Sequence, residues 1–319
     1  MRTLFFNLLI FTLLAGCQAT KIPTMPVTDA LPHALAPLKK ITVGNHQIAF
    51  WEGGKGKEVL LFVHGLGSNS SFWKENLPAF TEGYRVIAID LPGYGASSKE
   101  QVPATMPWFA DQVAAFLTAM RIEKVTYVGL SMGGQIGMTL ALQHPDKVSK
   151  LVLVSAAGIE TFDEKARTSL RNFMTVKSIM EATDPQITTS IALNFDTYDA
   201  PKFGWLVEQR KAWKTRPDFR AYAEVNEKSV SGMLDGAVYE QLDVLHLPVL
   251  VLYGKGDKMI PNRFFNPGLT TADIASRAGS ALHNAKVELV EKAGHLLPLE
   301  QPEAFNRVLL TWLKNSPSK

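Results

Sequence analysis

The sequence predicts an α/β fold, in which helices cover both faces of a doubly wound, mostly parallel sheet. A continuous apolar run at residues 58–63 is typical of a strand buried on both faces, and residues 148–155 predict a further buried strand. Segments with helical spacing of apolar residues, such as 105–121, alternate with these runs. At residues 124–137 a buried strand leads through a sharp, glycine-rich turn into a helix. This alternation is typical of parallel strands joined by helical crossovers.

Composition narrows the class of protein. The chain has 319 residues, of which 46% are hydrophobic and 20% charged, enough for one large domain or two small ones. The net charge is +3 and the charges are scattered, so we expect no nucleic-acid surface. A single cysteine excludes an intrachain disulfide and a cysteine-based metal cluster. We expect no metal and no cofactor.

The first residues have the pattern of a signal peptide. A positive start is followed by an apolar stretch at residues 4–16, which is too short to span a membrane. Residues 14–17, Leu-Ala-Gly-Cys, resemble the lipobox of bacterial lipoproteins, whose cysteine is lipidated and becomes the mature N-terminus. The resemblance implies a signal peptide at 1–16 and a lipid anchor on Cys17. An ordinary secretory signal or an uncleaved anchor are the alternatives.

Gln18 predicts where the protein is located, and the segment after it is predicted to lack regular structure. In lipoproteins a residue such as Gln18 usually implies sorting to the outer membrane, so we expect a lipid-anchored envelope protein facing the periplasm or the exterior. Residues 17–40 are rich in Pro, Thr and Ala, which argues against regular structure. We predict a tether there, or alternatively an extended segment packed along the domain.

The remaining strands are predicted in chain order. Alternation at residues 41–51 predicts a strand pair that turns at Gly44-Asn45. Further apolar runs predict strands at residues 84–90, 247–254 and 287–290. The helix after the glycine-rich turn is expected to reach about residue 144, where Pro145 follows.

The glycine-rich turn carries the pattern G-x-S-x-G at residues 129–133, with Ser131 at its centre. A serine is a nucleophile only when a base can take its proton and its oxygen stands clear of the chain. A tight strand-to-helix turn places Ser131 at an exposed apex with strained backbone. Side chains at Gly129 and Gly133 would collide there. The pattern alone is weak evidence, so its context decides.

With these motifs together, the chain resembles the α/β-hydrolase fold superfamily, and within it the cap-bearing esterase and lipase-like branch. The resemblance covers about residues 41–315. It is carried by His64-Gly-Leu-Gly, by Asp90-Leu-Pro-Gly-Tyr-Gly, by the turn at Ser131, by the G-x-x-D-x-x-x-P loop at 254–261 and by the A-G-H loop at 293–295.

The resemblance implies roles for individual residues. Ser131 would be the nucleophile, Asp257 the triad acid and His295 the base. The backbone N–H groups of Leu66 and Met132 would form the oxyanion hole.

Two other polar residues precede the nucleophile. Because the base follows the nucleophile in this family, we interpret His64 as a residue that orders its loop. We interpret Asp90 in the same way.

After residue 156 the alternation of strands and helices stops. The family inserts a helical cap after its sixth strand, so we predict a cap at 157–239 and a core at 41–156 and 240–315. Helical spacing indicates helices near residues 164–180, 185–193 and 202–214. Nine apolar residues are candidates to roof a pocket, although most would serve as the core of the cap. They are Phe162, Phe173, Met174, Phe195, Tyr198, Phe203, Trp205, Trp213 and Phe219.

The sequence therefore predicts a serine esterase or lipase-like enzyme that acts on a small-molecule ester of apolar character, with a membrane reached through lipidated Cys17. The C–C bond hydrolases of meta-cleavage type share Ser-Met-Gly-Gly and remain an alternative. A ligand-binding lipoprotein without catalysis is a second alternative. The acyl length, the leaving group and the oligomeric state are not specified by the sequence.

Overall fold

The computed structural model describes residues 34–316. The predicted signal peptide, Cys17 and most of the predicted tether lie outside these residues. Within the described part of the chain, no helix has the length and apolar character needed to cross a membrane.

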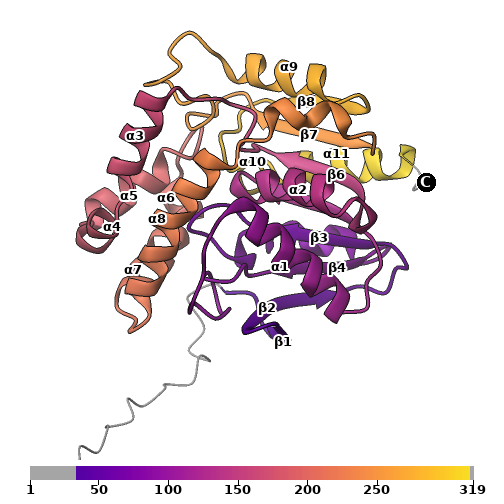
Figure 1. Ribbon diagram of the computed structural model, residues 1–319, viewed down its shortest axis with the longest axis horizontal. Helices are drawn as coiled ribbons and strands as arrows, with labels where there is room; N and C mark the ends of the chain where they lie inside the picture. Colours follow the sequence, from indigo (N-terminus) through magenta and orange to yellow (C-terminus); the bar gives the residue numbers. More distant parts are fainter. Residues whose placement is uncertain (1–33, 317–319) are drawn as a thin grey trace, which may run out of the picture.

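The centre of the molecule is an eight-stranded sheet in the order β1-β2-β4-β3-β5-β6-β7-β8 (Figure 1). β1 and β2 pair antiparallel, as do β2 and β4, whereas the pairs from β4 to β8 are parallel. The predicted mostly parallel sheet is therefore confirmed. The strands are β1 Lys39–Val43, β2 His46–Gly53, β3 Val59–Val63, β4 Arg85–Ile89, β5 Val125–Leu130, β6 Val148–Val154, β7 Val249–Gly254 and β8 Ala285–Val290.

Helices cover both faces of this sheet. Successive side chains of a strand point to opposite faces, so each face has apolar side chains that the helices bury. Leu61 and Val63 of β3 belong to one hydrophobic cluster, which includes residues of α1, α2 and α9. Leu60 and Phe62 belong to a second cluster, which includes residues of α10 and α11. The helices are α1 Met106–Ala119, α2 Met132–Gln143, α9 Thr271–Ala281, α10 Leu297–Glu300 and α11 Pro302–Asn315. Short 3₁₀ turns are η1 Ser70–Trp73, η2 Leu77–Phe80, η3 Pro145–Lys147 and η4 Tyr239–Val244.

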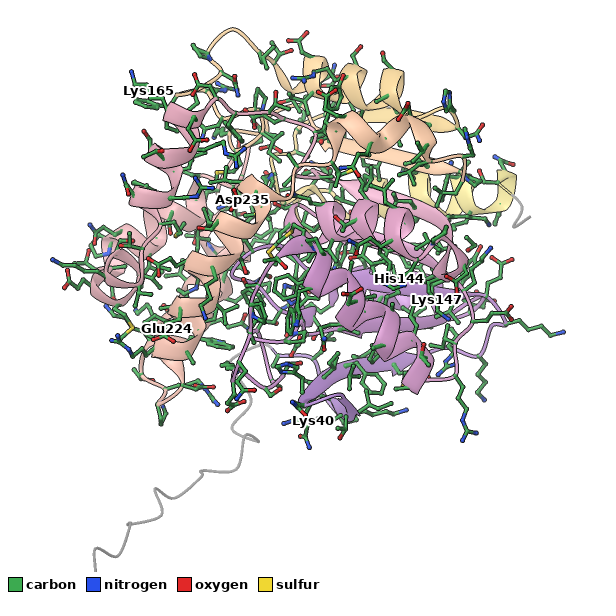
Figure 2. All side chains as sticks on the ribbon, viewed as in Figure 1. Lys40, His144, Lys147, Lys165, Glu224 and Asp235 are labelled. Atoms are coloured by element: carbon green, nitrogen blue, oxygen red, sulfur yellow. The ribbon has the colours of Figure 1, made fainter. Side chains whose placement is uncertain are left out.

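Six helices stand between β6 and β7, and we call them the helical insertion. Figure 1 shows them beside one end of the sheet. They are α3 Glu164–Phe173, α4 Val176–Glu181, α5 Asp184–Ala192, α6 Ala200–Phe203, α7 Trp205–Lys214 and α8 Phe219–Asp235. Asp235, at the end of α8, pairs with Arg167 and Arg171 of α3 at 2.6 Å in each case (Figure 2).

Two details of the insertion differ from the sequence prediction. The single helix expected near residues 164–180 is two helices, because Thr175 caps a new helix and exchanges hydrogen bonds with Ser178. The long helix α8 was not among the predicted helical segments. α9, in the core, was not predicted either.

Candidate active site

The turn after β5 has the strain that the sequence predicts. Ser131 has φ 52° and ψ −115°, a conformation that L-residues rarely adopt. A Cβ on Gly129 would lie 2.4 Å from Gly133 O, and one on Gly133 would lie 2.6 Å from His64 O. Glycine is therefore required on both sides of the serine, as predicted.

The loops after β7 and β8 bring the predicted acid and base together. Asp257 is fully buried, and its Oδ2 lies 2.9 Å from His295 Nδ1. Its Oδ1 accepts hydrogen bonds from the backbone N–H groups of Met259 at 2.8 Å and Ile260 at 3.0 Å. The carboxylate is thus held so that one oxygen remains for the imidazole.

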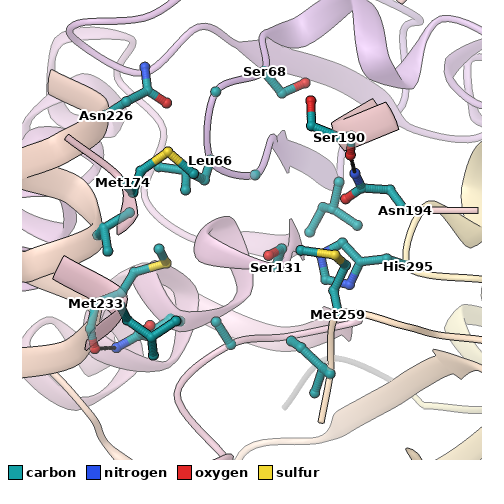
Figure 3. Close-up of a pocket in the computed structure, with 18 of the residues that line it drawn as sticks. Leu66, Ser68, Ser131, Met174, Ser190, Asn194, Asn226, Met233, Met259 and His295 are labelled. Atoms are coloured by element: carbon teal, nitrogen blue, oxygen red, sulfur yellow. Dashed lines mark hydrogen bonds between the residues drawn. The ribbon is translucent and has the colours of Figure 1, made fainter. Parts of the chain in front are cut away.

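Ser131 and His295 line the same cavity, and Figure 3 shows their side chains next to each other. Since Nδ1 faces Asp257, the opposite ring nitrogen, Nε2, is left for the serine side. The structure thus brings together the three residues that the sequence predicts as a triad. In the chain, Asp257 follows Ser131 by 126 residues, and His295 follows Asp257 by 38 residues.

The loop that carries His295 is fixed by a carboxyl group that the sequence analysis did not single out. Glu300 Oε2 accepts from Gly294 N–H at 2.6 Å, and Oε1 accepts from Asp196 N–H at 3.0 Å. Burial raises the pKa of the Glu300 carboxyl above its usual value. Glu300 thus joins the loop of the base to the segment between α5 and α6.

The predicted oxyanion donors lie near the nucleophile. Leu66 lines the cavity, and Met132 is the first residue of α2, directly after Ser131. A Cβ on Gly65 would lie 3.2 Å from Ser131 Cβ, so the loop after β3 passes close to the serine. Among residues 34–316, the Leu66 N–H donates no hydrogen bond to another backbone group. The Met132 N–H is at the first position of α2, where an N–H has no partner within the helix. Both donors remain available to a ligand.

His64 and Asp90 each hold a loop through hydrogen bonds, as predicted from the sequence. His64 Nε2 accepts from Leu91 N–H at 3.1 Å, and Nδ1 lies 2.8 Å from Gly65 O. Burial lowers the pKa of the His64 imidazole, which agrees with a neutral ring that donates from Nδ1 and accepts at Nε2. The two carboxylate oxygens of Asp90 accept from Ser70 N–H and Ala96 N–H, each at 2.7 Å.

A cavity of about 670 Å³ surrounds Ser131 and His295, and the helical insertion forms much of its wall. Four of the nine apolar residues predicted as candidates line it: Phe162, Phe173, Met174 and Trp213. The other five do not. Of these, Phe195 and Phe203 stack at 4.5 Å between ring centroids and belong to the second hydrophobic cluster. That cluster also contains residues of the sheet, so these two residues do not form a core of the insertion alone.

Polar groups of the insertion contact the loop after β3, and sequence reasoning missed them. Gly67 O accepts hydrogen bonds from Arg210 Nη2 at 2.8 Å and from the Tyr222 hydroxyl at 2.9 Å. Asn69 Nδ2 donates to Gln209 Oε1 at 2.8 Å. No sequence motif marks these residues, because the contacts join segments about 140 residues or more apart.

One acidic residue of the cavity wall was also missed. Glu160 is buried, and its Oε1 accepts from Asn262 N–H at 2.8 Å and from Asn266 Nδ2 at 2.6 Å. Burial raises the pKa of this carboxyl above its usual value, and the negative charge of Asp257 adds to the effect. Among residues 34–316, no cluster of three or more His, Cys, Asp and Glu side chains could hold a metal ion.

Comparisons with known proteins agree with this architecture. Residues 58–203 match the family model described as alpha/beta hydrolase fold. The chain is 27% identical to Protein ABHD8 of Mus musculus over 279 residues, covering 85% of this chain and 58% of that protein. It is 24% identical to the uncharacterized hydrolase YugF of Bacillus subtilis over 293 residues, covering 88% of this chain and 99% of YugF. It is 27% identical to the putative carbamate hydrolase RutD of Caulobacter vibrioides, covering 88% of this chain and 100% of RutD.

Solved structures of similar fold include a membrane phospholipase A described as a bacterial virulence factor. The TM-score is 0.73 at 25% identity, covering 88% of this chain and 86% of that one. A probable hydrolytic enzyme of Pseudomonas aeruginosa has a TM-score of 0.76 at 23% identity, covering 87% and 93%. An esterase of Thermogutta terrifontis has a TM-score of 0.72 at 24% identity, covering 88% and 99%.

The chain therefore has the α/β-hydrolase fold, and the match over residues 58–203 supports its place in that superfamily. The chain spans just over half the length of ABHD8, but nearly the whole of YugF and RutD. YugF and RutD, which the chain matches over nearly their whole length, are both described as hydrolases.

Proposed function

We propose that the protein is a serine hydrolase that cleaves carboxylic esters of apolar character through an acyl-enzyme. The observation that carries the proposal is the pairing of His295 with buried Asp257 at 2.9 Å, in the same cavity as Ser131 on its strained turn. Acyl transfer needs a nucleophile, a base in the same cavity and a group that orients the base.

In the proposed reaction Ser131 Oγ attacks the acyl carbon, and His295 Nε2 takes its proton. His295 then gives this proton to the departing alcohol. A water molecule, deprotonated by His295, hydrolyses the acyl-enzyme and regenerates the serine. Asp257 fixes the imidazole tautomer and stabilises the imidazolium formed in each half of the cycle.

The N–H groups of Leu66 and Met132 would stabilise the negative charge on the tetrahedral oxygen. Met132 also lies at the N-terminus of α2, whose dipole favours an anion there. Each donor of this kind contributes about 3 kcal/mol at the transition state.

The cavity supports an apolar acyl group. Leu170, Ile179, Leu206 and Val230 line it together with the aromatic residues named above. A phospholipase A and an esterase among the structural neighbours agree with such a substrate, although the fold alone does not specify it.

Location at a membrane is a separate proposal, because it depends on residues 1–33. Lipidation of Cys17 would anchor the protein in the bacterial envelope. Cys17→Ser should move the protein from the membrane fraction to the soluble fraction, and retention of the variant in membranes would contradict the lipid anchor.

The ester proposal is tested by rates on p-nitrophenyl esters of graded acyl length, measured on the chain from residue 18. We expect a maximum at medium or long chains, a loss of about 10⁵-fold in kcat for Ser131→Ala and about 10⁴-fold for Asp257→Asn. No turnover of any ester, despite labelling of Ser131 by a fluorophosphonate, would contradict ester cleavage. That outcome would favour the C–C bond hydrolase alternative, which a vinylogous diketone substrate would then test.

A further inference from the structure

Exposed apolar side chains gather around the mouth of the cavity. Among residues 34–316, five large apolar side chains are exposed: Phe173, Leu193, Val244, Met259 and Phe264. Phe173, Leu193 and Met259 also line the cavity that contains Ser131. Single exposed apolar residues are ordinary on a protein surface, but their concentration at one opening is not.

Phe264 belongs to the same rim through a row of aromatic rings. It is 83% exposed, and its ring centroid lies 4.8 Å from that of Phe265. Phe265 in turn lies 6.5 Å from Phe162, which lines the cavity. We call Phe173, Leu193, Met259 and Phe264 the apolar rim. Figure 3 shows one of them, Met259, beside His295 and Ser131.

The rim draws on separate segments of the chain. Phe173 ends α3, and Leu193 follows α5, so both come from the helical insertion. Met259 and Phe264 come from the loop after β7, close to Asp257. Folding therefore brings residues of both halves, Phe173, Leu193 and Met259, to the wall of one cavity.

We propose that the apolar rim is a docking surface for a lipid surface, from which a single acyl ester passes into the cavity. This inference rests on the proposed function and adds the physical state of its substrate. The rim is continuous with an apolar cavity, so the occupant must be apolar and must release molecules small enough to enter. A lipid layer satisfies both conditions, whereas a protein partner on the rim would block the entrance.

Charge next to the rim agrees with a lipid surface. Residues 258–266 contain two basic residues, Lys258 and Arg263, and no acidic residue. Both are exposed, and they alternate with the exposed side chains of Met259 and Phe264. Lys258 Nζ donates to Phe195 O and Asp196 O at 2.9 Å in each case, so Arg263 is the cation that we expect to contact lipid. Cations beside apolar side chains are the pattern of segments that lie at the interface of anionic lipids.

The place where the described chain begins agrees as well. The Leu35 N–H donates to Ser71 Oγ at 3.1 Å, and the adjacent residue Phe72 lines the cavity. The tether predicted after Cys17 therefore joins the domain beside η1, one residue of which, Phe72, lines the cavity. Its 17 residues from 17 to 33 could reach about 56 Å when extended, at about 3.3 Å per residue. A tether of this length would keep the start of the domain within that distance of the membrane that holds the lipid.

The experiment measures co-sedimentation of the chain from residue 18 with two kinds of vesicle. One is phosphatidylcholine, and the other is phosphatidylcholine mixed with phosphatidylglycerol. We expect binding to both and tighter binding to the anionic vesicles. Phe173→Ser and Phe264→Ser should each weaken partition about fivefold to tenfold, because each removes a large apolar side chain from the lipid contact.

Val244→Ser is the matched control. Val244 is 61% exposed and ends η4, and it does not line the cavity. This variant should partition as the wild type does and hydrolyse a dissolved ester at the wild-type rate. Comparing partition with the rate on a dissolved short-chain ester separates loss of docking from loss of fold.

Two outcomes overturn the inference. One is hydrolysis of dissolved esters without partition to either vesicle. The other is partition that Val244→Ser weakens as much as Phe264→Ser does. Failure of the proposed function gives a different result from failure of docking. Vesicle binding does not require catalysis, so Ser131→Ala should still bind vesicles. Vesicle binding by a wild type that cleaves no ester would leave the docking surface standing and remove the esterase.

Discussion

Glu160 is a carboxyl group placed in the wall of an apolar cavity, and its raised pKa has a measurable effect on stability. A carboxyl whose pKa is higher in the folded protein stabilises the fold fully below its unfolded pKa, near 4.5, and loses that contribution as pH rises through the folded value. Because Glu160 Oε1 accepts both hydrogen bonds, a glutamine oxygen can replace it.

We therefore expect the stability advantage of the wild type over Glu160→Gln to fall as pH rises above 4.5 and to level off above the raised pKa. At neutral pH the variant should be at least as stable as the wild type. Urea unfolding at a series of pH values measures this difference. A variant that is less stable at every pH by a constant amount would show that the carboxylate acts through its hydrogen bonds instead of its charge.

At the scale of elements, the helical insertion contacts the loop that carries the proposed oxyanion donor. Tyr222 of α8 and Arg210 of α7 both donate to Gly67 O, one residue after Leu66. A carbonyl held from two sides fixes the direction of the Gly67–Ser68 peptide, which is the second peptide unit after the one that carries the Leu66 N–H. The position of the insertion and the geometry of the oxyanion hole are thus coupled.

Tyr222→Phe should lower kcat about threefold to tenfold with little change in KM, because the lost hydrogen bond matters most when the oxyanion forms. Tyr94→Phe is the matched control. Its hydroxyl is also buried and donates to Ser229 at 2.8 Å, and its ring lies 6.2 Å from that of Tyr222, but it has no bond to this loop. Equal losses of kcat in the two variants would mean that general destabilisation, and not the loop, is responsible.

The elements differ in how well the sequence predicted them, and packing explains the difference. β3 was predictable because all five of its residues are buried, which leaves a continuous apolar run. α8 was missed because its buried face includes Asn226, Ser229 and Gly232, which hide the helical period. α9 is rich in Ala and Ser, and only the capping box of Thr270 and Asp273 marks its start.

The residues of the site also differ in how well the sequence predicted them. Ser131, Asp257 and His295 occupy loops with recognisable short motifs, because the geometry of a strand end restricts the residues around it. Gly129 and Gly133 show this restriction directly, since neither position has room for a Cβ. Glu160, Arg210 and Tyr222 reach the cavity through contacts between distant segments, which no local pattern records.

At the scale of the whole molecule, the insertion shares both hydrophobic clusters with the sheet. Trp213, Phe219 and Tyr222 belong to the cluster on one face, and Phe195 and Phe203 belong to the other. The insertion therefore has no separate core of its own among these residues. Domains that share a core unfold together.

We expect a single cooperative transition in differential scanning calorimetry of the chain from residue 18, with a ratio of calorimetric to van't Hoff enthalpy of about one. The same transition should appear when unfolding is followed by far-UV circular dichroism. Two resolved transitions, with ester hydrolysis lost in the first, would show instead that the insertion unfolds before the sheet.

The strained backbone of Ser131 affects which residue is favoured at this position. A residue other than glycine at φ 52° and ψ −115° costs about 1–3 kcal/mol of stability, a large part of what a domain has. Glycine would remove that cost, so selection for folding alone favours glycine at position 131. A protein that needed no hydroxyl at this turn would gain stability from that replacement. The strained serine is therefore what the proposed nucleophilic role of Ser131 leads us to expect.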